Sequence, residues 1–154
     1  MSARLIAVVL GLALAGLASA STSVEDAWKR AAAKLDMPVF ATPSAPLGLT
    51  RFYVKPRKLT TCGSTKEQLT ALYSAGGREV FFVEAKPHVC GDLGAAIVLG
   101  KPIVRGARSA LFSLGPQTLL LIFTRQGVEI GIQTKRVTRA QLLAIANAVR
   151  LVPG

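Results

Sequence analysis

Hydrophobic and polar residues alternate most clearly in the C-terminal half of the chain. Val128, Ile130 and Ile132 alternate with more polar residues, which is the pattern of a half-buried strand. A continuous apolar run precedes them and indicates a central strand that is buried on both faces, with Gly127 in the turn between the two. Another apolar stretch leads into a Gly-Pro turn at residues 115–116. The strands predicted for this half are 103–112, 119–123 and 128–133.

A helix with clear signals follows these strands. Thr138 and Gln141 have the spacing of a capping box, and Val137 with Leu142 suits a hydrophobic staple. The next apolar residues repeat at helical spacing. They are Leu142, Ile145, Ala146 and Val149.

A second amphipathic helix is predicted closer to the N-terminus, beginning after Ser23 and ending before Pro38. Its apolar side consists of Val24, Ala27, Trp28, Ala31 and Leu35. Residues 37–49 contain three prolines and little periodicity. We expect them to lie extended across the surface, as a linker between this helix and the sheet.

The middle of the chain has two interpretations. Residues 69–74 and 78–84 resemble two strands joined by a Gly-rich loop at 75–77, which predicts a β-hairpin. Alternatively, residues 64–67 fit a capping box, and a helix over 65–74 would account for the same sequence. We favour the hairpin, and the helix stays open as the alternative.

The stretch from Arg51 to Leu59 alternates and contains Pro56, which confines it to an edge strand. It is also the densest basic segment of the chain. Its cations are Arg51, Lys55, Arg57 and Lys58. On an edge strand such charges deter edge-to-edge aggregation. They are also the candidate residues for binding an anionic partner.

Together these elements predict an α+β domain, with an antiparallel β-sheet of about five strands and the N-terminal and C-terminal helices packed on one face. Residues 21–48 supply the first helix and the Pro-rich linker, and residues 49–154 form a single domain. The sequence shows no internal repeat.

The first twenty residues have the features of a cleavable secretory signal peptide. A charged start with Arg4 precedes an apolar run over residues 5–17 and the small residues Ala18, Ser19 and Ala20. The run is shorter than the roughly 20 residues that a membrane-spanning helix needs. We therefore expect cleavage after Ala20, and a secreted or periplasmic (extracytoplasmic) mature protein that does not span a membrane.

The chain is strongly basic, with a formal net charge of +11 at pH 7. This excess favours anionic partners, such as phospholipid headgroups or an acidic envelope polymer. The basic residues are scattered, aromatic residues make up 6% of the chain, and no nucleic-acid fold signature is present. The sequence therefore does not predict a specific nucleic-acid site, and another envelope protein is a further candidate partner.

Cys62 and Cys90 are the two cysteines of the chain, and an even number in an exported protein predicts a disulfide. If Ser74 pairs with Arg78 in the hairpin, the same register places Cys62 opposite Cys90 at its open end. A redox or metal-binding role is the alternative. Because the sequence has neither a C-x-x-C pair nor a histidine cluster, we expect no metal site.

Catalysis has one candidate group, in which Ser64, His88 and Asp92 would be the nucleophile, base and orienting acid. The sequence around Ser64 lacks a nucleophile elbow, and the Gly-rich segments lack phosphate-loop and dinucleotide spacing, so no cofactor is predicted. We favour a secreted, non-enzymatic binding or accessory module of the cell envelope. The alternative is a small hydrolase or transferase organised around His88.

The order of elements in the C-terminal half also resembles a known pattern. A strand with Val104-Arg105-Gly106, a buried strand, a Gly turn, an alternating strand and a helix with Leu142-Leu143-Ala144-Ile145-Ala146 follow one another. This order is similar to an uncharacterised extracytoplasmic domain family found in secreted, anti-sigma and sporulation-associated proteins of Gram-positive bacteria. The likeness covers residues 49–152 and implies a non-enzymatic envelope module with no catalytic residues to carry over. This chain differs from the membrane-anchored members because it stands alone behind a signal peptide.

Overall fold

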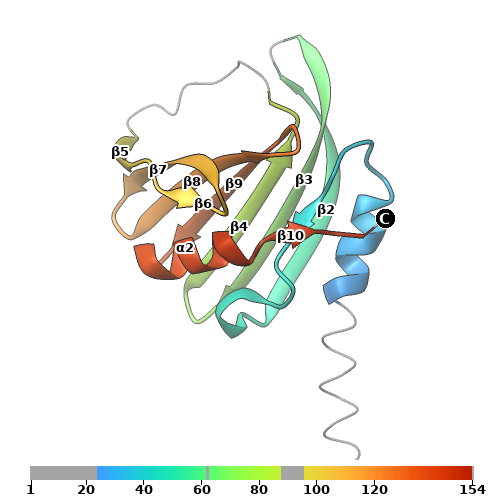
Figure 1. The fold of residues 1–154 in the computed structure, drawn as a ribbon. Helices are drawn as coiled ribbons and strands as arrows, with labels where there is room; N and C mark the ends of the chain where they lie inside the picture. Colours follow the sequence, from blue (N-terminus) through green and yellow to red (C-terminus); the bar gives the residue numbers. More distant parts are fainter. Residues whose placement is uncertain (1–23, 62, 88–95, 154) are drawn as a thin grey trace, which may run out of the picture.

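The computed structural model describes residues 24–61, 63–87 and 96–153. Its main element is an eight-stranded antiparallel sheet in the order β2-β3-β4-β9-β8-β7-β5, with β6 paired to β7, and a smaller sheet joins β1 to β10 (Figure 1). The strands are β1 (Phe40–Ala41), β2 (Arg51–Thr61), β3 (Ser64–Ala75), β4 (Arg78–Ala85), β5 (Ile97–Gly100), β6 (Ile103–Val104), β7 (Ala107–Gly115), β8 (Thr118–Arg125), β9 (Val128–Lys135) and β10 (Arg150–Leu151). The helical segments are residues 24–32, the 3-10 turn η1 (Pro46–Gly48) and α2 (Arg139–Ala148).

The predicted fold class, an α+β domain with a sheet of about five strands, is wrong. The described part of the chain is mostly β, with an eight-stranded sheet, a two-stranded sheet and two short α-helices. The expected strand 103–112 is two strands, because Arg105 and Gly106 have φ angles of 45° and 79° and turn β6 back onto β7. β2 continues through Pro56 because an edge strand tolerates a missing N–H group. β5 was not predicted.

The β3–β4 hairpin confirms the strand interpretation of residues 65–74 over the helical one. Its register differs by one residue from the expected register. Ala75 pairs with Arg78, so the turn contains only Gly76 and Gly77, whose φ angles are 57° and 76°. Two successive positive φ angles are typical of the tight turns that match the twist of a hairpin.

This register removes the geometric argument for the disulfide. Because Ser74 pairs with Glu79 rather than with Arg78, the ladder does not place Cys62 opposite Cys90. Both cysteines lie outside the described residues, so their bridge stays a prediction.

One face of the large sheet, here called the inner face, carries the core. It presents every second residue of each strand, including Tyr73, Phe82 and Ile130, which are all 0% exposed. The helix over residues 24–32, α2 and the β1–β10 ribbon all lie on this side of the sheet (Figure 1). Trp28 packs edge-on against Phe82 with ring centroids 6.1 Å apart, and its Nε1 donates a hydrogen bond of 2.6 Å to the Tyr73 hydroxyl. Leu142 of α2 is also 0% exposed.

The capping box before α2 is confirmed. The Thr138 hydroxyl accepts a hydrogen bond from the Gln141 N–H at 3.2 Å, and the Gln141 side chain accepts one from the Thr138 N–H at 3.0 Å. Residues 37–49, expected to cross the surface as an extended linker, are instead partly buried in the core. Met37, Val39 and Phe40 are buried, because β1 pairs with β10 and closes over the inner face.

Candidate functional site

The predicted basic stretch lies on β2, at one edge of the large sheet. Phe52 stacks on the core residue Tyr73, so the intervening side chains at odd positions point to the opposite side, here called the outer face. Three of the four predicted cations share that face and are exposed, and together they are called the basic row. The basic row consists of Arg51, Lys55 and Arg57. Lys58 has the other parity and is directed away from it.

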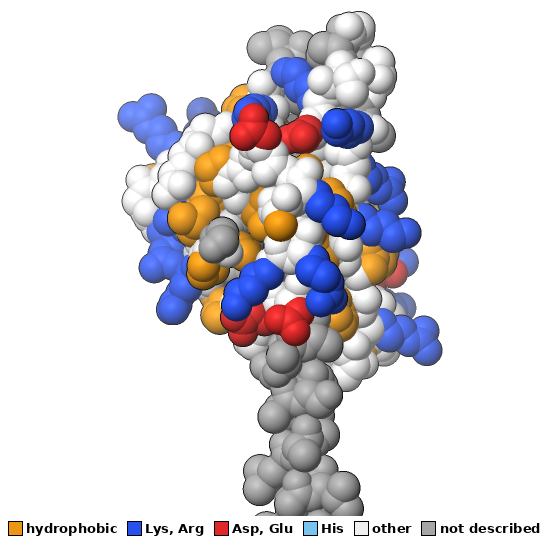
Figure 2. Space-filling view, turned by 90° about the vertical axis from the view of Figure 1, so that its right-hand side faces the viewer, with side chains coloured by type: hydrophobic (Ala, Val, Ile, Leu, Met, Phe, Trp, Pro, Cys, Tyr) orange, Lys and Arg blue, Asp and Glu red, His pale blue; other side chains and the backbone are white. Residues whose placement is uncertain are grey.

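The surroundings of the basic row leave its charge uncompensated. Lys55 lies over the ring of Tyr53, 5.7 Å from its centroid. Within the described residues the one ion pair joins Lys29 to Glu25, on the N-terminal helix. Figure 2 shows Lys and Arg side chains spread over this side of the molecule, whereas acidic side chains are fewer and most of those visible lie near its top and bottom. The positive charge of the basic row is thus exposed on the surface and is not paired with acidic side chains of the described residues.

The proposed catalytic group is not assembled by the described part of the structure. Ser64 begins β3, while His88 and Asp92 lie outside the described residues, so the grouping stays a prediction. Among the residues that are described, no cluster of three or more His, Cys, Asp or Glu side chains is placed to hold a metal ion.

The outer face is a largely apolar surface that crosses seven strands. The strand register aligns its side chains in two neighbouring rows. The first row is Tyr53, Leu72, Phe81, Gln133, Leu120, Phe112 and Val98, and the second is Lys55, Thr70, Val83, Gly131, Ile122 and Ala110. Most of the large apolar members are half-buried by their neighbours. The described helices all lie on the other side of the sheet (Figure 1), so no described helix covers this apolar surface, which is unusual for a sheet with one packed face.

A cavity of about 180 Å³ lies in the middle of the outer face. It is lined by Gln68, Phe81, Val83, Ala85, Leu120, Ile122, Glu129, Gly131 and Gln133. Gly131 causes the hollow, because it leaves a gap between Val83 and Ile122 in the second row. A Cβ atom at this position would lie 3.8 Å from the Val83 carbonyl oxygen and 3.9 Å from Leu120 Cδ1, which is ordinary contact. The backbone therefore does not require glycine here, and the absent side chain matters only for the space it leaves.

One wall of this cavity carries an unsatisfied polar group. The Gln68 Oε1 atom is buried and has no hydrogen-bond partner among the described residues. Leaving a buried acceptor unpaired costs about 1 to 3 kcal/mol. Gln68 lies directly opposite Arg57 in the β2–β3 ladder, so the polar end of the cavity adjoins the basic row. No local signal in the chain predicts this cavity, because it forms where β4 pairs with β9, which lies far away in the sequence.

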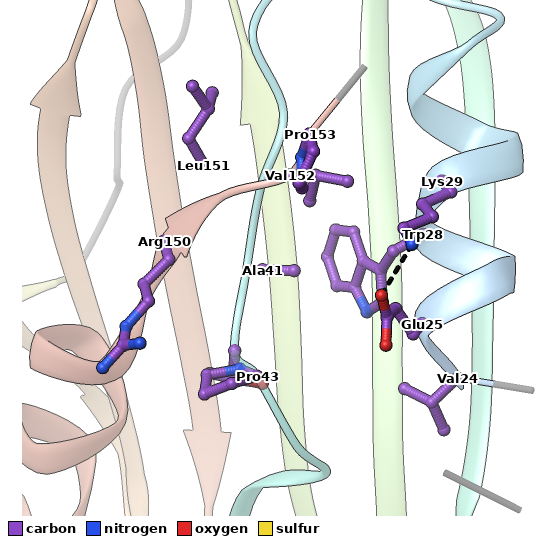
Figure 3. A pocket seen from close by; sticks show the side chains of 11 residues that line it. Val24, Glu25, Trp28, Lys29, Ala41, Pro43, Arg150, Leu151, Val152 and Pro153 are labelled. Atoms are coloured by element: carbon purple, nitrogen blue, oxygen red, sulfur yellow. Dashed lines mark ion pairs between the residues drawn. The ribbon is translucent and has the colours of Figure 1, made fainter. Parts of the chain in front are cut away.

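A second cavity, of about 250 Å³, lies between the N-terminal helix and the C-terminal segment (Figure 3). Val24, Ala41 and Val152 contribute to its mostly apolar lining. The ion pair of Lys29 and Glu25, 2.6 Å long, lies at its edge (Figure 3). The hydrogen bond and charge of that carboxylate raise the pKa of Lys29. Lys29 and Glu25 compensate each other, whereas the exposed Arg150, which also lines this cavity, forms no ion pair with another described residue (Figure 3).

Glu84 is the one acidic side chain in the described core. It points to the inner face of β4 and is 0% exposed, and its Oε2 accepts a hydrogen bond of 2.9 Å from the Phe40 N–H. Its Oε1 has no partner among the described residues. Burial raises the pKa of this carboxyl to about 8, because the charged form is desolvated. At neutral pH it is therefore mostly protonated and holds β1 against the sheet.

Comparison of the chain with protein-family models, with curated proteins and with solved structures found no match. In the described part of the chain, neither helix has the length and apolarity needed to cross a membrane.

Proposed function

We propose that the protein is a non-enzymatic, extracytoplasmic binding module that holds an anionic partner through the basic row of β2. The observation that carries the proposal is the shared direction of Arg51, Lys55 and Arg57, which are exposed on one face of an edge strand. None of them forms an ion pair with another described residue. The extracytoplasmic location depends on the expected signal peptide, residues 1–20, which lie outside the described residues.

The geometry of the row favours a partner with several spaced anionic groups. Residues two apart on one strand are about 6.6 Å apart, so Lys55 and Arg57 are neighbours and Arg51 lies about 13 Å from Lys55. An anionic polymer or the headgroups of an anionic lipid layer would present charges over such a span. Because Pro56 interrupts the hydrogen-bonding groups of β2, recognition through side chains is favoured over addition of a strand from the partner.

Retention on sedimented vesicles of phosphatidylglycerol and phosphatidylcholine tests the proposal. The test variant replaces Arg51, Lys55 and Arg57 with Gln. A matched control replaces Arg30, Lys34 and Arg139, which are exposed elsewhere, and removes the same charge. We expect the test variant to lose most retention at low salt, while the control stays near wild type. Equal losses in both variants would mean that net charge alone is responsible and would overturn the assignment to β2.

The alternative, a small hydrolase or transferase organised around His88, makes a different prediction. Replacing His88 with Ala would then lower the rate of any reaction that the protein catalyses by orders of magnitude. The binding proposal expects vesicle retention of the His88→Ala variant to equal that of wild type. Loss of retention in that variant, with folding preserved, would contradict the role given to the basic row.

A further inference from the structure

The apolar rows and the basic row meet on the same face, and this combination points to the chemistry of the ligand. We propose that the outer face binds a single-chain anionic amphiphile, such as a fatty acid, with its acidic group at Lys55 and Arg57 and its chain lying across Val83 towards Gly131. The inference rests on the proposed function, since Lys55 and Arg57, two of the three cations of the basic row, would bind the acidic group. It adds an apolar ligand portion that a polymer lacks.

One row of the sheet leads from the basic row to the cavity, with Thr70 between Lys55 and the apolar Val83. Lys55 pairs with Thr70, which in turn pairs with Val83, and Val83 pairs with Gly131. A ligand lying along this row passes from a cation to an apolar hollow across three strand spacings, or roughly 14 Å. An extended acyl chain of medium length covers such a distance. A partly exposed apolar surface that no described helix covers is typical of a binding site rather than of a free sheet face.

Charge sets the direction of the ligand. The basic row lies at the β2 edge, whereas Glu129 lines the central cavity from β9. An acidic group would be repelled near Glu129 and attracted near Arg57, so the chain end and not the headgroup belongs at Gly131. The unpaired Oε1 of Gln68, which lies opposite Arg57, offers an acceptor for a hydroxyl or a protonated acid at the headgroup end.

The size of the cavity agrees with a chain rather than a compact ligand. Its volume of about 180 Å³ is below the roughly 300 to 1,000 Å³ that sites for drug-sized ligands occupy. It would hold the end of one chain between Phe81 and Ile122, while the rest lies across the half-buried side chains of the two rows. Each methylene group removed from water there is expected to tighten binding about fourfold, so chain length should set affinity.

Calorimetric titration with dodecanoate and with uncharged dodecanol, both below their aggregation concentrations, tests the inference. Wild type is expected to bind dodecanoate more tightly than dodecanol. Replacing Lys55 and Arg57 with Gln should weaken dodecanoate binding about tenfold, the effect of two exposed ion pairs, and leave dodecanol unchanged. Replacing Gly131 with Leu should weaken both ligands by about tenfold or more, because the side chain fills the hollow.

Two further variants keep the result interpretable. Thr124→Leu also adds a leucine to the outer face, but outside the cavity, and should bind both ligands as wild type does. Val83→Thr keeps the side-chain shape and should weaken both ligands even if Gly131→Leu fails to fold. Unchanged binding in folded Gly131→Leu or in Val83→Thr would overturn the amphiphile inference. Vesicle retention that still depends on the basic row would in that case leave the proposed function standing.

Discussion

The buried carboxyl of Glu84 should make the stability of the protein fall as the pH rises. Its neighbours across the ladder are Leu69 on β3 and Ile130 on β9, and Phe40 of β1 contacts its Oε2. None of these residues carries a charge that could stabilise the ionised form. The pKa of Glu84 therefore rises from 4.5 to about 8 in the folded protein.

The size of the effect follows from proton linkage. Between pH 4.5 and about 8, folded Glu84 keeps a proton that the unfolded chain has released. The unfolded state gains stability from this release, so the free energy of unfolding falls with pH by about 1.4 kcal/mol per pH unit in the middle of the window. The full window amounts to about 5 kcal/mol, a large share of the 5 to 15 kcal/mol by which domains are usually stable.

Urea unfolding of wild type and the Glu84→Gln variant, at a series of pH values from 4.5 to 9, measures this contribution. Glutamine keeps an acceptor for the Phe40 N–H and does not ionise. We expect similar stability at the acid end and a variant that is more stable by about 5 kcal/mol near pH 8 to 9. The control is Glu79→Gln, an exposed position on the same strand, which should follow wild type. Parallel pH profiles for wild type and Glu84→Gln would refute the reasoning.

Three other predictions concern the core, the C-terminal helix and the cysteines. Trp28→Phe removes the donor to the Tyr73 hydroxyl and should cost about 1 to 3 kcal/mol in urea unfolding; a neutral result would contradict that bond. Thr138→Ala should cost about 1 kcal/mol, and unchanged thermal stability would argue against the cap. If Cys62 and Cys90 form a disulfide, intact-mass analysis should show that the exported protein is two hydrogens lighter before reduction than after it. Free thiols in the exported protein would exclude the bridge.

The elements that sequence predicted well are those with local signals. The capping box at Thr138 and the alternation from Val128 to Gln133 each depend on residues within one element, and α2 and β9 follow them closely. The sheet was underestimated because β5 was missed and residues 103–112 were expected to form one strand rather than β6 and β7. β5 lies at an edge after a Gly-rich segment, and its apolar residues Ile97 and Val98 are 65% and 59% exposed, so they show no alternation of burial.

In the candidate site, too, features with a local sequence signal differ from features that depend on strand pairing. Lys55 and Arg57 were candidate cations from the sequence, but the prediction did not use their two-residue spacing, which places both on one face of a strand. The apolar rows beside them were not predicted, because a shift of one residue in register exchanges the two faces of a strand. In the sequence, Gly131 is only one of the residues that alternate with the apolar positions of β9. Its role as the gap between Val83 and Ile122 depends on β4 and β8 pairing with β9 from either side.

The most direct test of the outer face as the binding surface is methyl NMR spectroscopy of the selectively labelled protein during titration with dodecanoate. We expect shifts of the Val83, Leu120 and Ile122 methyl groups on the outer face, with small changes at Ile130 of the inner face. Shifts concentrated instead at Val24 and Val152, beside the second cavity, would contradict it.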